Sequence, residues 1–125
     1  MKTKQGTKST TKKYDFVKKP WGDYERFTLN EKSTVKILRL KPHQRFSLQK
    51  HSSRTEFWKF LDNPAKVTIG NKTIKVSKGD MITIPKGSTH RIQALNKPVQ
   101  ILEISLGNFK ETDIKRIEDD YGRAY

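Results

Sequence analysis

The sequence contains no cysteine, so disulfide bonds and thiolate metal sites are excluded. It has no apolar run long enough to cross a membrane, and its first residues lack the roughly 7–15 consecutive apolar residues of a secretory signal peptide. Hydrophobic residues make up only 32% of the chain, while an aromatic content of 10% argues against general disorder. We therefore expect a cytoplasmic protein with one compact domain.

Acidic residues are scarce as well, with 13 against 27 lysines and arginines, and the net charge is +14. Residues 1–13 hold five lysines and no acid, which leaves 22 basic and 13 acidic residues, a net charge of +9, for the rest. Lysine, threonine, serine and glycine cannot bury enough apolar area to offset the entropy lost on ordering. We expect residues 1–13 to form a flexible basic tail and residues 14–125 to form a single domain.

The excess of positive charge suits an anionic partner such as a phosphosugar, a nucleotide, a nucleic acid or an acidic protein, although scattered lysines also serve solubility alone. No predicted helix carries a basic stripe, and no aromatic pattern typical of RNA-binding domains occurs. A lysine-rich tail supports only salt-sensitive attraction without sequence preference. We therefore expect no specific nucleic acid and no membrane among the partners.

Short segments rich in β-branched and aromatic residues recur from residue 23 onward, separated by turns that contain glycine, asparagine or proline. They include STVKILRLK (33–41), EFWKFL (56–61), AKVTIG, KTIKVS, DMITIP and VQILEISLG. Only residues 111–121 show a helical pattern, with Ile114 and Ile117 three residues apart. The pattern predicts an all-β sandwich or barrel of about eight to ten strands with a short C-terminal helix.

Four polar residues have the spacing of a metal site. Gln49 and His51 lie two residues apart and share one face of a strand, while Glu56 reaches that face only if residues 52–55 form a turn. His90 follows a second hairpin. Two imidazoles, a carboxylate and an amide suit zinc, manganese, iron, cobalt or nickel. The same residue types also occur as ordinary hydrogen-bonding groups, so spacing alone leaves both interpretations open.

The spacing of these residues also fits the two motifs of the cupin superfamily. The motif positions are His43, Gln49, His51, Glu56 and Asn63, followed by Gly79, Pro85, Gly87, His90 and Ala94. Glutamine at the first ligand position, within SLQKHSSRTEFW (47–58), resembles the cupin domain of type II phosphomannose isomerases, found alone or fused behind a mannose-1-phosphate guanylyltransferase. Further matches are KPWGDYE (19–25), IPKGSTHRI (84–92), ILEISLG (101–107) and DIKRIEDDYGR (113–123). Together the matches extend over residues 19–123.

The resemblance implies a jelly-roll double-stranded β-barrel that pairs as a homodimer. It further implies one divalent ion, with zinc expected first, on Gln49, His51, Glu56 and His90. The implied activity is an aldose–ketose isomerase that interconverts mannose 6-phosphate and fructose 6-phosphate through an enediol. The alternative is a cupin that acts on, or merely binds, another sugar phosphate or a nucleotide sugar. Phe57 stands where the family usually has histidine. This difference affects the implied activity if that histidine assists proton transfer, and changes little if it only packs beside Trp58.

Phosphate recognition requires fixed cations. Arg54 lies in the ligand-bearing turn and is our first candidate, followed by Lys86; the others are Arg91, Arg116 and Arg123. The alternative for each of these five residues is that it is only a solvated charge on the surface.

The proton carrier is a metal-bound water, Lys86, Glu103 or Asp119, and the catalytic candidates are Arg54, Lys86 and Glu103. We expect Trp21, in a turn that caps the barrel, and Trp58 to be core or dimer-interface residues.

Overall fold

The computed structural model describes residues 14–123, and every helix or strand in that part of the chain is a β-strand. The strands are β1 (Asp15–Lys19), β2 (Gly22–Arg26), β3 (Ser33–Leu40), β4 (Leu48–Lys50), β5 (Thr55–Phe60), β6 (Ala65–Ile69), β7 (Lys72–Val76), β8 (Met81–Ile84), β9 (His90–Ala94), β10 (Val99–Leu106) and β11 (Lys115–Glu118). No helix in residues 14–123 could cross a membrane. The predicted basic tail, residues 1–13, lies outside the described residues.

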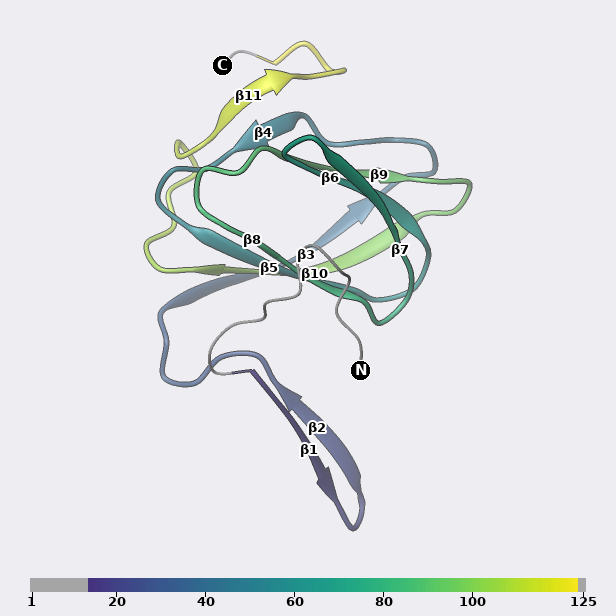
Figure 1. Ribbon diagram of the computed structural model, residues 1–125, viewed down its shortest axis with the longest axis vertical. Helices are drawn as coiled ribbons and strands as arrows, with labels where there is room; N and C mark the ends of the chain where they lie inside the picture. The colour runs from purple at the N-terminus through teal and green to yellow at the C-terminus, as the bar shows by residue number, and fades with distance from the viewer. Residues whose placement is uncertain (1–13, 124–125) are drawn as a thin grey trace.

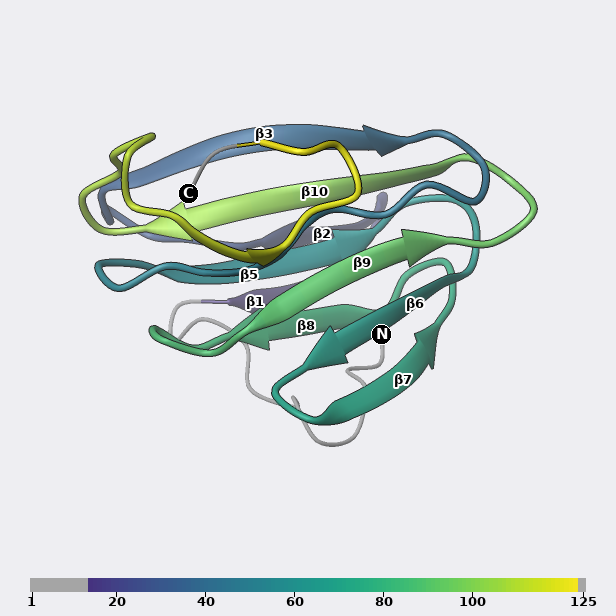
Figure 2. The same cartoon turned by 90° about the horizontal axis from the view of Figure 1, so that it is seen from above.

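Two antiparallel sheets face each other and enclose the interior of a barrel (Figures 1 and 2). One sheet has the order β3-β10-β5-β8, and the other has the order β11-β4-β9-β6-β7. Neighbours in both sheets come from distant parts of the chain, as in the pairing of β10 with β3 and β5. The predicted all-β jelly-roll barrel is confirmed.

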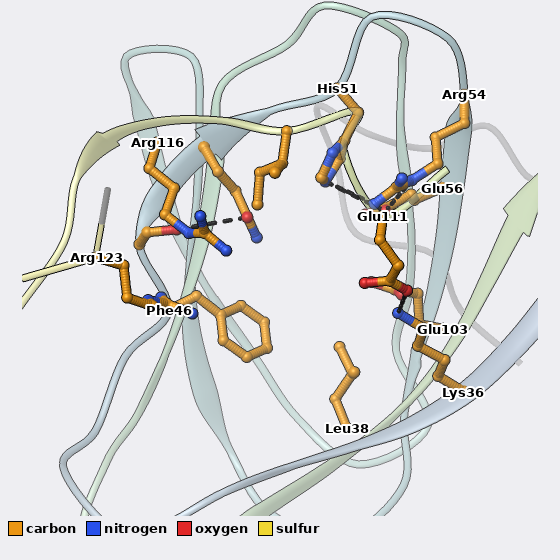
Figure 3. A pocket seen from close by; sticks show the side chains of 13 residues that line it. Lys36, Leu38, Phe46, His51, Arg54, Glu56, Glu103, Glu111, Arg116 and Arg123 are labelled. Carbon is orange, nitrogen blue, oxygen red and sulfur yellow. Dashed lines mark hydrogen bonds and ion pairs between the residues drawn. The ribbon is translucent and has the colours of Figure 1, made fainter. Parts of the chain in front are cut away.

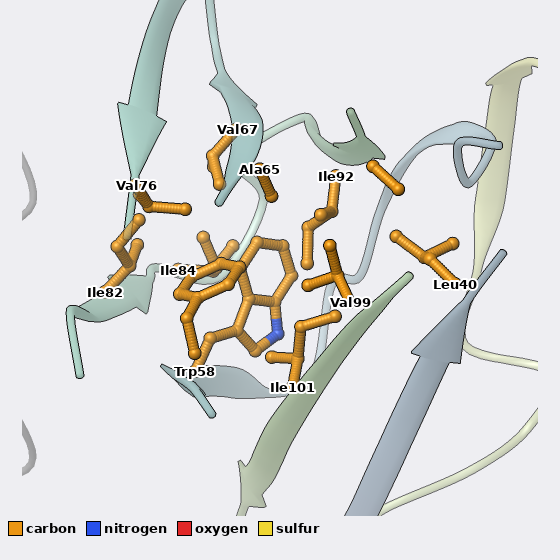
Figure 4. Packing of buried hydrophobic residues seen from close by; sticks show 12 residues of the cluster. Leu40, Trp58, Ala65, Val67, Val76, Ile82, Ile84, Ile92, Val99 and Ile101 are labelled. Atoms are coloured by element: carbon orange, nitrogen blue, oxygen red, sulfur yellow. The ribbon is translucent and has the colours of Figure 1, made fainter. Parts of the chain in front are cut away.

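The apolar core fills one part of the interior, between the two sheets (Figure 4). Alternate residues of each strand point inward, so Trp58 and Phe60 of β5 meet Val67 of β6 and Ile101 of β10. The Trp58 ring is fully buried and lies edge-on to Phe60, with 6.4 Å between ring centroids. This core supports the strands that carry the polar residues described below.

A second, smaller cluster covers the outer face of the four-stranded sheet. Phe57 lies between two inward-facing residues of β5 and therefore points outward, where it packs with Met81 and Ile104. Tyr14 and Phe27 cover it, with ring centroids 6.2 and 5.7 Å from that of Phe57. Position 57 thus faces away from the barrel interior.

The hairpin of β1 and β2 forms a separate two-stranded sheet that projects from the barrel (Figure 1). Its turn does not cap the barrel, because Trp21 lies at the tip of the hairpin with 72% of its surface exposed. Trp58 is therefore a core residue, as expected, whereas Trp21 is not part of the core of this chain, and its expected alternative role at a dimer interface stays a prediction.

The predicted C-terminal helix is absent from the described residues. Residues 111–112 form a turn, and β11 then pairs with β4 through Arg116 opposite Gln49. An isolated helix of this length is marginal in water, whereas the free edge of β4 offers a ladder of hydrogen bonds. Tertiary pairing therefore overrides the weak helical spacing of Ile114 and Ile117.

Candidate metal centre and its pocket

Three predicted ligands converge inside the barrel. His51 follows β4, Glu56 belongs to β5, and His90 begins β9; all three side chains are buried. Their ligand atoms lie within 4.8 Å of one another. Glu56 bridges the imidazoles, with its Oε2 3.4 Å from His51 Nε2 and its Oε1 3.6 Å from His90 Nε2.

The donor atoms of this cluster suit a divalent cation. Glu56 Oε1 and His90 Nε2 are buried and have no hydrogen-bond partner, which costs free energy unless a further group satisfies them. Both rings are held through the opposite nitrogen, because His51 Nδ1 bonds the Asp113 carbonyl at 2.6 Å and His90 Nδ1 bonds the Ser88 carbonyl at 2.9 Å. These bonds place the proton on Nδ1 and leave Nε2 unprotonated, which is the form of the nitrogen that can ligate a metal.

The electrostatics keep both imidazoles neutral. Burial lowers the pKa of His90 to about 4, and the charges of His51 and Arg54 act in the same direction. Burial also lowers the pKa of His51. Burial raises the pKa of Glu56, although the hydrogen bond and the charge of Arg54 oppose that rise. Neutral imidazoles at pH 7 are the form that binds a metal ion.

The fourth predicted ligand, Gln49, lies on β4 directly opposite His90 of β9. Its side chain lines the same cavity, and Ser47 Oγ donates a hydrogen bond to Gln49 Oε1 at 3.4 Å. Gln49 therefore lies on the cavity wall next to the cluster of His51, Glu56 and His90.

Arg54 is held against the ligands. It is 7% exposed; its Nε donates to Glu56 Oε2 at 2.9 Å, and its Nη2 lies 3.2 Å from His51 Nε2. Its Nη1 donates to the Lys110 carbonyl, and its guanidinium lies 4.3 Å from the Phe109 ring centroid. Arg54 therefore neutralises Glu56 and positions it within the cluster.

The cluster opens into a cavity of about 170 Å³ (Figure 3). Its wall carries four cationic side chains and three carboxylates, together with polar and apolar residues. The lining consists of Lys36, Leu38, Phe46, Ser47, Gln49, His51, Arg54, Glu56, Glu103, Glu111, Ile114, Arg116 and Arg123. An anionic ligand with several hydroxyl groups suits such a wall.

Glu103 is the predicted proton carrier that lines this cavity. It is 7% exposed and accepts a hydrogen bond from Trp58 Nε1 at 3.2 Å. Burial, followed by the charge of Glu56, raises the pKa of Glu103 to about 7. A carboxyl group with this pKa exchanges a proton readily near neutral pH.

Two predicted phosphate ligands lie outside the cavity lining. Lys86 is exposed in the turn between β8 and β9. Arg91 donates to the Phe46 carbonyl at 2.9 Å and pairs with Glu118 at 3.1 Å, so it connects β9 to β11. Asp119, the other proton-carrier candidate, pairs with Arg123 instead of lining the cavity.

Lys36 is a cavity residue that the sequence analysis missed. It lies on β3 opposite Glu103 and shares the inward phase of Leu38 and Leu40. A lysine in phase with two inward-facing leucines was the signal that could have identified it. Asp113, which holds His51, was also missed, and no local pattern distinguishes it from other acidic turn residues.

Comparisons with known proteins agree with this fold. The family model described as mannose-6-phosphate isomerase C-terminal matches residues 6–119. Alginate biosynthesis protein AlgA of Pseudomonas aeruginosa is 36% identical over 119 residues, which cover 94% of this chain and 25% of that protein. Mannose-1-phosphate guanylyltransferase ManC of Salmonella typhimurium is 35% identical over 110 residues, which cover 86% of this chain and 23% of that protein.

Solved structures show the same architecture. Oxalate decarboxylase from Bacillus subtilis superposes with a TM-score of 0.64 and 28% identity, covering 70% of this chain and 24% of that one. A cupin protein from Bacteroides fragilis superposes with a TM-score of 0.57 and 22% identity, covering 68% of this chain and 77% of that one, which supports the fold alone.

The comparisons contradict the predicted interconversion of mannose 6-phosphate and fructose 6-phosphate. The similar proteins are named for guanylyltransfer and for alginate biosynthesis, and the chain spans only about a quarter of their length. These findings favour the alternative, a cupin domain that acts on or binds another sugar phosphate or a nucleotide sugar.

Proposed function

Because the chain belongs to the family of mannose-6-phosphate isomerase C-terminal domains, we propose that it is a metal-binding cupin whose cavity holds a sugar phosphate or a nucleotide sugar. The observation that carries this proposal is the buried cluster of His51, Glu56 and His90, which opens into a cavity with cationic walls. The family is one of sugar-phosphate enzymes, and the cytoplasmic location expected from the sequence stays a prediction.

His51, Glu56 and His90 would hold the ion, with the Gln49 amide as a fourth ligand, and nitrogen and oxygen donors of this type suit zinc first. When bound, the ion polarises an oxygen of the ligand that reaches it. Arg54 aligns Glu56 and opposes the rise in the pKa of Glu56 that burial causes, while Glu103 holds a proton on the cavity wall close to the metal ligands.

The cations of the cavity would bind the phosphate. Lys36, Arg116 and Arg123 line the wall, where Glu111 pairs with Lys36 and Asp119 pairs with Arg123. A volume of about 170 Å³ lies below the range of roughly 300–1,000 Å³ that is typical of drug-sized ligands, so it favours a sugar monophosphate over a nucleotide sugar.

Calorimetric titration of the zinc-loaded protein tests this function. We expect binding of mannose 1-phosphate, weaker binding of GDP-mannose, and none of unphosphorylated mannose. Arg116→Ala should weaken phosphosugar binding by about tenfold, the loss of one charge-assisted contact of about 1.4 kcal/mol. Lys86→Ala, which removes an exposed lysine outside the cavity, is the matched control. Equal binding of mannose and its phosphates would refute the proposal.

We also propose that the chain forms a homodimer through its projecting hairpin. Residues 14–27 carry three acidic and three basic side chains, a neutral surface in a chain of net charge +14. Phe16 and Trp21 are 40% and 72% exposed there, and Val35 and Ile37 of the edge strand β3 are 58% and 45% exposed. A second copy can meet this neutral, apolar surface without charge repulsion and cover β3, which has no strand partner on its outer edge within residues 14–123.

A further inference from the structure

One acidic side chain contacts the ligand-bearing turn from a different part of the fold. The segment of residues 107–114 connects β10 to β11 and lies beside the turn that follows β4. Asp113 Oδ1 accepts hydrogen bonds from the backbone N–H and the hydroxyl of Ser52, both at 2.9 Å. Its Oδ2 accepts one from the Ser53 N–H at 2.9 Å.

The backbone of the same residue contacts a metal ligand. The Asp113 carbonyl accepts the 2.6 Å hydrogen bond from His51 Nδ1. Its side chain therefore holds the turn next to His51, while its main chain holds the ring of His51. This double attachment determines where the turn lies and which ring nitrogen faces Glu56 and His90.

The turn needs such support because it joins two strands of different sheets. Gln49 lies in β4 of the five-stranded sheet and Glu56 lies in β5 of the facing four-stranded sheet, so the chain crosses from one sheet to the other through the break at residues 52–54. Backbone N–H groups in the break have no strand partner in β4 or β5, and a carboxylate that accepts two of them restricts the turn to one conformation. Arg54, which donates to the Lys110 carbonyl, ties the same segment to the turn a second time.

We propose that Asp113 is a positioning residue of the metal centre, which presents His51 Nε2 to the ion and makes the segment of residues 107–114 part of the site. This inference rests on the proposed metal centre. Groups that orient a metal ligand through its second nitrogen typically alter metal affinity by about 10–100-fold when they are removed.

The test compares two carboxylates with matched hydrogen bonds. Asp62 also accepts three, from the Asn63 N–H at 2.7 Å and from the N–H and side-chain amide of Gln100 at 2.9 and 3.2 Å. It lies in the turn after β5, and its hydrogen-bond partners, Asn63 and Gln100, are not residues of the metal cluster. Asp113→Ala and Asp62→Ala therefore remove similar hydrogen bonds, but only the first touches the metal centre.

Zinc affinity is measured by competition with a chelator, and the tautomers of the imidazoles are measured by ¹⁵N NMR of the metal-free protein. Asp113→Ala keeps the carbonyl that faces His51 but releases the turn that places His51, so it should weaken zinc binding by about tenfold, the lower end of that range, and mix the tautomers of His51. Asp62→Ala should lower thermal stability and leave both readouts at their wild-type values. Asp113→Asn retains one acceptor oxygen, so its zinc affinity should lie between that of Asp113→Ala and that of the wild type. This variant keeps the inference testable if Asp113→Ala does not fold.

Three results would overturn the inference. If Asp113→Ala binds zinc with wild-type affinity, Asp113 has no positioning role, although the metal centre itself is unaffected. If Asp62→Ala loses as much zinc affinity as Asp113→Ala, the effect is one of general stability. A wild-type protein that binds no zinc, manganese or cobalt would refute the metal centre itself, and the inference with it.

Discussion

The clearest quantitative prediction concerns Glu103→Gln in the metal-free protein. Burial and the neighbouring charge of Glu56 raise the pKa of Glu103 from 4.5 to about 7. Between these two pH values the folded state holds a proton that the unfolded state has released, so folding becomes less favourable as pH rises through that window. Above pH 7 both states are ionised, and the folded protein bears the whole cost, about 3 kcal/mol for a rise of that size.

Glutamine is neutral at every pH and keeps an oxygen that can accept the hydrogen bond from Trp58 Nε1. Glu103→Gln should therefore raise the free energy of unfolding by up to about 3 kcal/mol at pH 8 and change it little at pH 4.5. The histidines of the cluster lose stability as pH falls below 6.5, but both proteins contain them, so that effect cancels in the difference between variant and wild type.

Urea unfolding in the presence of a chelator measures this difference at both pH values. Glu111→Gln is the control, because the side chain of Glu111 is 78% exposed on the rim of the same cavity and the substitution should show no such pH dependence. If the stabilisation by Glu103→Gln at pH 8 does not exceed that at pH 4.5, the carboxyl is not held protonated by burial and the argument fails.

Three further predictions concern the metal, the outer cluster and self-association. His51→Ala should abolish zinc binding in calorimetry, whereas replacement of His43, an exposed turn residue with a φ of 65°, should leave it intact. Phe57→His should lower the free energy of unfolding by about 1–3 kcal/mol, because it buries an imidazole among apolar side chains, and a change in zinc affinity would contradict its outward position. Trp21→Ser should convert a dimer into a monomer in analytical ultracentrifugation, whereas Tyr121→Ser, at an exposed aromatic residue elsewhere, should not. In the wild type, acrylamide quenching of Trp21 should decrease with protein concentration, since Trp58 is already buried; constant quenching in a monomeric protein would refute the hairpin interface.

Local patterns in the sequence were sufficient to predict the strands and most of the metal cluster. Side chains alternate between the two faces of a strand, so the spacing of Gln49 and His51 placed them together, and the motif added Glu56 and His90. The same alternation set Glu103 apart from Leu102 and Ile104, and the structure has Glu103 facing the cavity while Ile104 packs on the outer face.

Contacts between distant segments decided the rest. Arg91 and Arg116 are equally basic in the sequence, but pairing of β11 with β4 brings Arg116 to the cavity and leaves Arg91 as a link to Glu118. The strand β11 forms in place of the predicted helix because it pairs with β4, and Asp113 contacts the ligand-bearing turn at His51. In both cases the two partners are more than 60 residues apart in the chain. Alternation and turn chemistry act over a few residues, whereas these contacts depend on which edges and turns meet after the sheets have closed, and only the tertiary structure contains that information.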